Sequence, residues 1–309
     1  METEKKEVIF KIKNLKTWFP ITKGFMKKVV GNVKAVDDVS IEVYKGETLG
    51  IVGESGCGKS TFGKTVMMLE KPTGGEVLFN YNGEYKDITK FNKDEMFEFR
   101  KKVQMVFQDP LASFNPKMKI GDILTEPLMN YKKIKRSERN AKARELLRMV
   151  ELPEDFVDRY PHNMSGGQRQ RISIARALSL EPEILVCDEA TSALDVSVQE
   201  SVIELLVRLQ KEKNICMIFI CHDLALIRSF AHQIAVMYLG SVVEKAPVEE
   251  LFENPLHPYT KALLSVIPIP EIHEVKKELA IQGEVVSPIN LPDECRFYKR
   301  CPVRCDACR

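Results

Sequence analysis

The sequence predicts an α/β fold built on a parallel sheet, with a helical segment inserted in its middle. Strand-like apolar runs alternate with helical segments along most of the chain, which is typical of a parallel sheet. Between about residues 120 and 159 the pattern becomes helical, and no convincing strand follows before the run EILVCDE at 183–189. After about Ala246, Pro-rich segments predict an appended C-terminal region.

The first part of the chain has the alternation of β-strands. It extends over residues 8–43 and is interrupted by the basic run ITKGFMKKVVGNVK at 21–34, which we expect to form a loop. Further on, the run at 74–88 places Asn82-Gly83 between two extended segments, which predicts a β-hairpin.

The parallel sheet is predicted from short, strongly apolar runs. ETLGIVG (47–53) predicts a buried strand that enters a Gly-rich turn, and STFGKTVMML (60–69) predicts the helix after it. Further strands are expected in ILVCDE, CMIFICHD and QIAVMYLG, together with a helix over 198–213.

Composition excludes several functional classes. The 309 residues are 44% apolar and 29% charged, with a formal net charge of +2, too close to neutral for a nucleic-acid or membrane-surface binder. The N-terminus lacks a secretory signal, and the longest apolar run, 215–221, is far shorter than the ~20 residues that span a bilayer. We therefore expect a cytoplasmic chain whose cysteines are reduced thiols or metal ligands.

The run GESGCGKS (53–60) matches the pattern G-x-x-x-x-G-K-[ST], between a predicted strand and a predicted helix. In such a loop, backbone N–H groups surround a phosphate group at the positive end of a helix. Lys59 would reach the β- and γ-phosphates, and the Ser60 hydroxyl would ligate Mg²⁺. The predicted phosphate-binding residues are Gly53, Ser55, Gly56, Gly58, Lys59, Ser60 and Thr61.

A second run, ILVCDE, is an apolar strand that ends in two carboxylates. Asp188 is expected to hold Mg²⁺ and Glu189 to act as the general base for the attacking water. Together with the phosphate loop, this run predicts a nucleoside triphosphatase.

The run MSGGQ (164–168) opens a helix and predicts a second anion site, formed by Ser165, Gly166, Gly167 and Gln168. The phosphate loop already binds one triphosphate, so the second site needs another. We expect it to close on the γ-phosphate of the nucleotide that a partner subunit holds, in a head-to-tail dimer. Here the sequence resembles the ABC ATPase family, whose L-S-G-G-Q signature it matches except at Met164.

The resemblance implies roles for further residues. Gln108 corresponds to the Q-loop, which contacts Mg²⁺ and the attacking water; Asp195 corresponds to the D-loop, and His222 to the switch histidine at the γ-phosphate. Adenine would stack on an aromatic residue near TWFP, where Phe19 is preferred over Trp18.

The same resemblance implies the fold and its division into domains. The fold is a P-loop NTPase (RecA-like) core with an antiparallel β subdomain, a helical insert and a small Cys-rich C-terminal extension. We expect an ATP-binding domain over 1–245, with the insert at about 109–174, and the extension over 246–309.

Within the family, FQDPLASFNP, NPLHPYTKALL, QGEVVSPINLP and CRFYKRCP resemble the ATP-binding subunits of oligopeptide and dipeptide importers. This resemblance implies a peripheral subunit on the cytoplasmic face of the membrane. Its partners would be a second, often non-identical ATPase subunit, two permeases and an external binding protein. The same branch also moves nickel or glycosides. The alternatives are a soluble ABC ATPase of ribosome or DNA function, or one of iron–sulfur assembly.

Four of the eight cysteines crowd the last fifteen residues, at Cys295, Cys301, Cys305 and Cys308. Four thiolates suffice for a tetrahedral metal or a four-iron cluster. The resemblance favours a 4Fe-4S cluster, followed by zinc and then by reduced surface thiols. The tail has no strong apolar pattern, so we expect a metal to order it, at a site structural rather than catalytic and distant in sequence from the phosphate loop.

Overall fold

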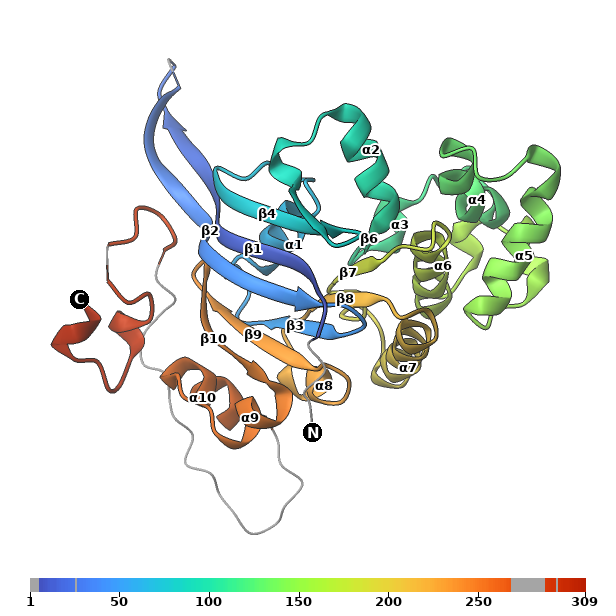
Figure 1. The fold of residues 1–309 in the computed structure, drawn as a ribbon. Helices are drawn as coiled ribbons and strands as arrows, with labels where there is room; N and C mark the ends of the chain where they lie inside the picture. The colour runs from blue at the N-terminus through green and yellow to red at the C-terminus, as the bar shows by residue number, and fades with distance from the viewer. Residues whose placement is uncertain (1–5, 26, 268–286, 293) are drawn as a thin grey trace, which may run out of the picture. The chain divides into compact units, whose positions relative to one another are not determined.

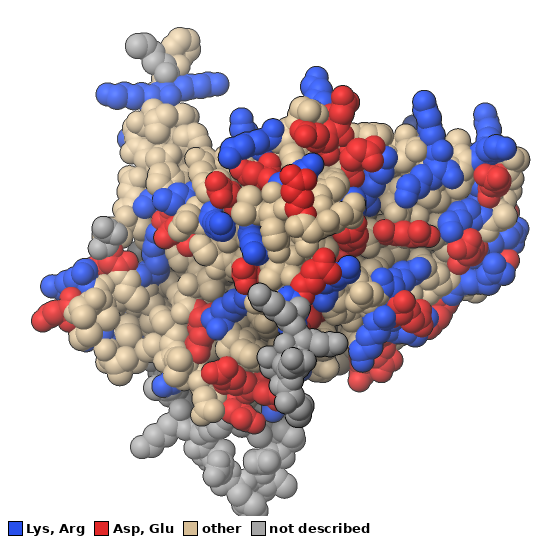
Figure 2. Space-filling model, in the orientation of Figure 1, with Lys and Arg blue, Asp and Glu red and all other residues tan. Residues whose placement is uncertain are grey.

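The computed structural model describes residues 6–25, 27–267, 287–292 and 294–309 (Figure 1). The chain divides into two compact units, one formed by residues 1–91 with 220–309 and the other by residues 92–219. On the face drawn in Figure 2, basic and acidic side chains are interspersed. No helix in the described part of the chain is long and apolar enough to cross a membrane.

The first unit contains an antiparallel sheet with the strand order β2-β1-β4-β5. Its strands are β1 (Val8–Lys23), β2 (Lys28–Tyr44), β4 (Gly74–Tyr81) and β5 (Glu84–Asp87). Asn82 and Gly83 have φ values of 52° and 94°, the left-handed pair that a two-residue hairpin turn requires, so the predicted hairpin is confirmed.

The predicted basic loop at 21–34 was wrong in extent. β1 and β2 continue through it as a paired ribbon that ends at Lys23 opposite Lys28, with a shift in register between Ile21 and Thr22. β-branched residues in this run favour extended backbone, and cross-strand pairing such as Thr22 with Val29 continues the ladder.

The first unit also holds the strands β10 (Ser241–Pro247), β9 (Gln233–Tyr238) and β3 (Thr48–Val52), which are neighbours in this order. β3 is parallel to β9, and all five β3 residues are buried, as its apolar run predicts. Its helices are α1 (Lys59–Val66), α8 (Leu224–Arg228), α9 (Val248–Glu253) and α10 (Pro258–Ser265), with 3-10 turns at Ile88–Lys90, Tyr298–Arg300 and Asp306–Cys308.

The second unit combines the strands β8 (Cys216–Ile220), β7 (Ile184–Asp188) and β6 (Val103–Val106) with most of the helices. The helices are α2 (Lys93–Lys102), α3 (Pro110–Ser113), α4 (Ile120–Asn130), α5 (Arg139–Met149), α6 (Gly166–Leu178) and α7 (Val196–Lys213). The helical character of 120–159 is confirmed by α4, α5 and a 3-10 turn at Glu154–Asp158. The sequence did not predict β6, which has four residues and pairs in parallel with β7.

Candidate functional site

The predicted phosphate loop leads from the end of β3 to the start of α1. Gly53, Gly56 and Gly58 have φ values of 149°, 78° and 105°, a region that favours glycine. A Cβ added at Gly53 would lie 2.2 Å from the carbonyl oxygen of Met237, and one at Gly58 would lie 1.9 Å from that of Ala35. Both glycines are therefore required by backbone conformation and by close packing against neighbouring backbone.

Lys59, the first residue of α1, is only 4% exposed, and its ammonium group is held by the loop itself. Nζ donates to the carbonyl oxygens of Gly53 at 2.7 Å and Glu54 at 3.0 Å. Ser60 and Thr61 follow in the first turn and are half-buried. An ammonium group and the N-terminus of a helix thus concentrate positive charge at one point, which favours the binding of a phosphate group.

Cys57 lies inside this loop, and its thiol is buried. Burial raises the pKa of Cys57 and outweighs the opposing effect of Lys59. The thiol is therefore neutral at physiological pH and acts as a small packing residue, as predicted. Cys187, Cys216 and Cys221 are also buried, which confirms the same interpretation for them.

In the second unit, the predicted acidic pair lies at the end of β7. Asp188 is 6% exposed, and Glu189 follows it with a φ of 47°. Gln108, just after the parallel neighbour β6, donates a hydrogen bond from Nε2 to Glu189 Oε2 at 2.7 Å. The structure thus brings together the predicted general base and the predicted Q-loop residue, because parallel strands end at the same edge of a sheet.

The signature run forms a capping box at the start of α6. The Ser165 hydroxyl accepts a hydrogen bond from Gln168 N, and Ser165 N donates to Gln168 Oε1. A Cβ added at Gly167 would lie 2.4 Å from Val198 Cγ1, so this glycine allows the close approach of α6 to α7. Ser165 and Gly166 are exposed, and this leaves the start of the helix open.

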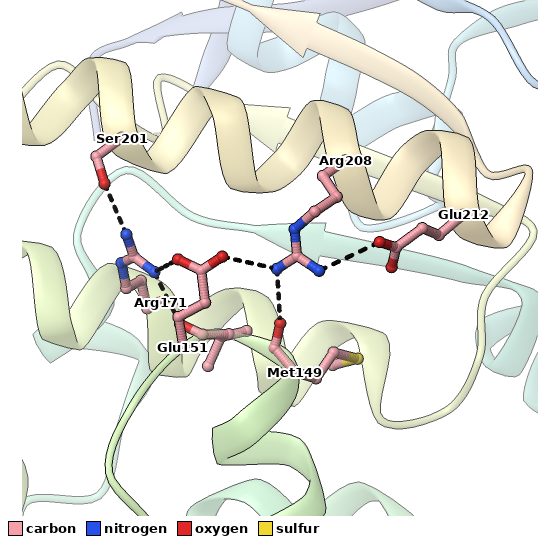
Figure 3. Close-up of polar contacts among 7 residues, drawn as sticks. Met149, Glu151, Arg171, Ser201, Arg208 and Glu212 are labelled. Atoms are coloured by element: carbon pink, nitrogen blue, oxygen red, sulfur yellow. Dashed lines mark hydrogen bonds and ion pairs between the residues drawn. The ribbon is translucent and has the colours of Figure 1, made fainter.

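An ion-pair network fixes α6 to its neighbours in the second unit (Figure 3). Glu151 accepts a hydrogen bond from Arg171 of α6 at 2.8 Å and another from Arg208 of α7 at 3.0 Å. Arg171 also donates to the Ser201 hydroxyl of α7 at 2.6 Å. The hydrogen bond from Arg171 and the charges of both arginines lower the pKa of Glu151. One carboxylate therefore links the segment after α5 to both α6 and α7.

Two further predicted residues are exposed at the ends of secondary-structure elements. His222 comes just after β8 and belongs to the first unit, where its neighbour Cys221 donates from its backbone N to the Ile51 carbonyl oxygen of β3 at 3.1 Å. This bond places His222 near the strand that leads into the phosphate loop. Asp195 precedes α7 in the second unit, and its side chain makes no capping hydrogen bond; its neighbour Val196 is 82% exposed.

The two aromatic residues of β1 differ in their surroundings. Trp18 is half-buried, donates from Nε1 to Asp37 Oδ1 at 2.9 Å, and lies under the ammonium group of Lys34. Phe19 is 39% exposed on the opposite side of the strand. Of these two residues, Phe19 is therefore the more exposed.

The C-terminal tail differs from its predicted character in two respects. Phe297 is 1% exposed and packs against the rings of Tyr238, Tyr259 and His257, so apolar packing orders the tail where none was expected. Arg300, a residue that the sequence did not single out, forms an ion pair with Glu54 of the phosphate loop across 246 positions of sequence.

The structure brings only some of the four tail cysteines close together. Cys305 Sγ and Cys308 Sγ lie 3.6 Å apart, and Cys295 N donates to the Cys308 carbonyl oxygen at 2.8 Å. No group of three or more potential metal-ligating side chains was found within the described ranges. The predicted four-cysteine site, with Cys301 as its remaining member, is therefore not supported by the structure.

The family described as ABC transporter matches residues 36–192, and the family described as Oligopeptide/dipeptide transporter, C-terminal region, matches residues 243–308. The chain belongs to the ABC transporter family. It is 48% identical to the oligopeptide transport ATP-binding protein AppF of Bacillus subtilis, covering 100% of this chain and 94% of that protein. It is 46% identical to the oligopeptide transport ATP-binding protein OppF of Salmonella typhimurium, covering 99% and 92%.

Solved structures agree with this assignment. The dimeric, post-hydrolysis structure of the ATP-binding cassette MJ0796 with ADP and Pi superposes with a TM-score of 0.67 at 30% identity, covering 78% of this chain and 99% of that one. The predicted fold class, a P-loop NTPase core with an antiparallel β subdomain and a helical segment, is thereby confirmed.

Proposed function

We propose that this chain is the ATP-hydrolysing subunit of an importer that moves oligopeptides or dipeptides across the cytoplasmic membrane. The observation that carries the proposal is the C-terminal match at 243–308, joined in one chain to a cassette with all the nucleotide-site motifs. Relatives over the full length are oligopeptide transport ATP-binding proteins, which favours import over a soluble role in iron–sulfur assembly or on ribosomes or DNA. In this proposal residues 1–245 bind and hydrolyse ATP, with an insert at about 109–174, and residues 246–309 form the extension.

Each residue of the site has a chemical role in this proposal. Lys59 and the N–H groups of the loop hold the β- and γ-phosphates, and Phe19 stacks on adenine. Ser60, Asp188 and Gln108 carry the oxygen ligands that Mg²⁺ prefers, and the bound ion would neutralise charge on the phosphate oxygens. The other phosphate contacts are Gly53, Ser55, Gly56, Gly58 and Thr61.

Hydrolysis then requires a base and an oriented water molecule. Glu189 accepts a proton from the attacking water as the oxygen bonds to the γ-phosphorus, and the bond to the leaving ADP oxygen breaks. The hydrogen bond from Gln108, at 2.7 Å, supports this role because it fixes the direction of the Glu189 carboxylate. His222 donates to the γ-phosphate.

We further propose that the active form is a head-to-tail dimer, with a paralogue as the partner subunit. Ser165, Gly166, Gly167 and Gln168 would close on the triphosphate held by the partner, and Asp195 would cross the interface. The exposure of Ser165, Gly166 and Asp195 supports this arrangement, as does the dimeric state of the similar cassette MJ0796.

The complex would also include two permeases and an external binding protein, with this chain peripheral on the cytoplasmic face. The helical segment between Asp109 and Pro161 would receive a cytoplasmic helix of a permease. Gln108 at its edge would then move the nucleotide contacts together with the membrane contact.

For the tail we propose a metal, either a 4Fe-4S cluster or, second, zinc. The 3.6 Å separation of Cys305 Sγ and Cys308 Sγ is far longer than a disulfide and close to the ~3.8 Å between two thiolates on one zinc ion. Iron, sulfide and zinc contents after anaerobic purification decide between them. A metal-free protein with an ordered tail contradicts both.

The test of the proposed function is assembly with its partners. Affinity purification of this chain from detergent-solubilised membranes should recover two permeases and a second ATPase subunit. ATP hydrolysis by that complex should rise when a peptide-loaded binding protein is added. Crosslinks from a permease should reach residues 109–161. Recovery with ribosomes or iron–sulfur assembly proteins instead of permeases would refute the proposal.

A further inference from the structure

The structure assigns Arg300 as a positioning residue that sets the phosphate loop, through Glu54, for binding the nucleotide. The inference rests on the proposed function, because it concerns the same ATP site. It adds a role for the C-terminal tail that the nucleotide-site motifs do not include.

Glu54, the second residue of the phosphate loop, is held at three points. Its carboxylate accepts hydrogen bonds from Arg300 Nη1 at 2.9 Å and Nη2 at 3.2 Å, a bidentate ion pair. Its backbone N–H donates to the Tyr259 hydroxyl at 2.9 Å, and its carbonyl oxygen accepts from Lys59 Nζ at 3.0 Å. Glu54 therefore connects the tail and α10 directly to the lysine that is proposed to hold the triphosphate.

The phosphate loop itself provides few other contacts that fix the position of Glu54. Ser55 and Gly56, which follow Glu54, are exposed, and the glycines provide no side-chain contacts. The Glu54 carbonyl oxygen also accepts from Cys57 N at 3.3 Å, so a shift of Glu54 would displace the next turn of the loop together with Lys59.

Arg300 is well placed to hold Glu54 because it is buried. The residue is 9% exposed, and Nη1 also donates to the Tyr238 hydroxyl at 3.3 Å. Burial opposes the charged form, but the hydrogen bonds to Glu54 and Tyr238 and the charges of both groups together outweigh it and raise the pKa of Arg300. The Glu54 side chain is 26% exposed, so the pair is partly buried and loses less strength to solvent and salt than a surface pair does.

The tail segment that carries Arg300 is itself anchored to the same unit. Phe297 fills the aromatic site between β9 and α10, and Arg296 pairs with the buried Asp37, which also accepts from Trp18. Upstream, Asn290 exchanges hydrogen bonds with Asn32 of β2, and this places the tail beside that strand (Figure 1). The tail therefore forms a fixed support for Arg300.

The test measures nucleotide affinity of the full-length chain with N-methylanthraniloyl-ATP and Mg²⁺, well below the thermal transition. Arg300→Met, which keeps volume and removes charge, should raise Kd about tenfold. Arg300→Lys keeps the charge but not the bidentate geometry and should give an intermediate value. The matched control Arg304→Met, at an exposed position of the same tail, should bind as wild type.

Two further outcomes separate positioning from simple stabilisation. In the assembled complex, Arg300→Met should raise KM for ATP about tenfold and change kcat less than twofold. In the Glu54→Gln background the same substitution should add little, because Arg300 acts through Glu54. An unchanged Kd in Arg300→Met, or an equal rise in Arg304→Met, would overturn the inference. Failure of the wild-type chain to bind the nucleotide would instead refute the proposed function.

Discussion

Replacing Phe297 by alanine tests whether packing, rather than a bound metal, orders the C-terminal tail. Phe297 is 1% exposed, with ring centroids 5.3 Å from Tyr238, 5.5 Å from Tyr259 and 5.7 Å from His257. Removing a buried Phe side chain costs about 3–5 kcal/mol. We expect the tail to open locally, without global unfolding, so this cost should fall mainly on the local opening equilibrium.

A loss of about 3 kcal/mol corresponds to a rise of roughly 100-fold in the exchange rate of tail amides. The reporting amides are Tyr298 N and Arg300 N, which donate to carbonyl oxygens of the tail itself. Hydrogen exchange of Phe297→Ala measures the effect, with Val303→Ala, 69% exposed in the same tail, as the control. Unchanged protection in Phe297→Ala would refute the packing argument, as would full loss of protection when the wild-type chain is treated with a chelator.

Two other substitutions test local features of the structure. Gly167→Ala should destabilise the protein by about 1–3 kcal/mol in urea unfolding, because its Cβ would lie 2.4 Å from Val198 Cγ1. Val198→Ala should restore most of that loss, and no rescue would contradict the packing of α6 on α7. Burial lowers the pKa of His257 from its ordinary 6.5, and its Nδ1 accepts from Tyr259 N at the start of α10. His257 therefore binds its proton at a higher pH in the unfolded chain than in the folded chain. The free energy of unfolding should fall as the pH drops below 6.5. His257→Asn, which keeps the capping acceptor, should lack that decrease, and an equal decrease in the variant would assign it to other groups.

Local signals made much of the fold predictable. Asn82-Gly83 specifies its hairpin turn through positive φ values at both positions, and the buried strands β3 and β7 follow from short apolar runs. β6 has too few residues to stand out by its own pattern, and its strand conformation depends on pairing with β7. The run at 21–34 is rich in lysine, which suggested a loop, but cross-strand pairing extends both strands through it.

The candidate site likewise has one part that the sequence predicts and one part that it does not. The phosphate loop is readable because its chemistry requires glycines, a lysine and a hydroxyl at fixed spacing. The Arg300–Glu54 pair joins residues 246 positions apart, and neither residue type is informative by itself. Only the tertiary structure brings the two side chains together.

The most direct test of the central claim is the ATPase rate of the assembled transporter with Glu189→Gln in this chain. Amide substitution preserves shape and removes the base, so hydrolysis at this site should fall at least roughly 100-fold while ATP binding persists. Glu249→Gln, at an exposed position of α9, should leave the rate unchanged. Retention of near wild-type hydrolysis at this site in Glu189→Gln, measured with a catalytically silent partner subunit, would contradict the account.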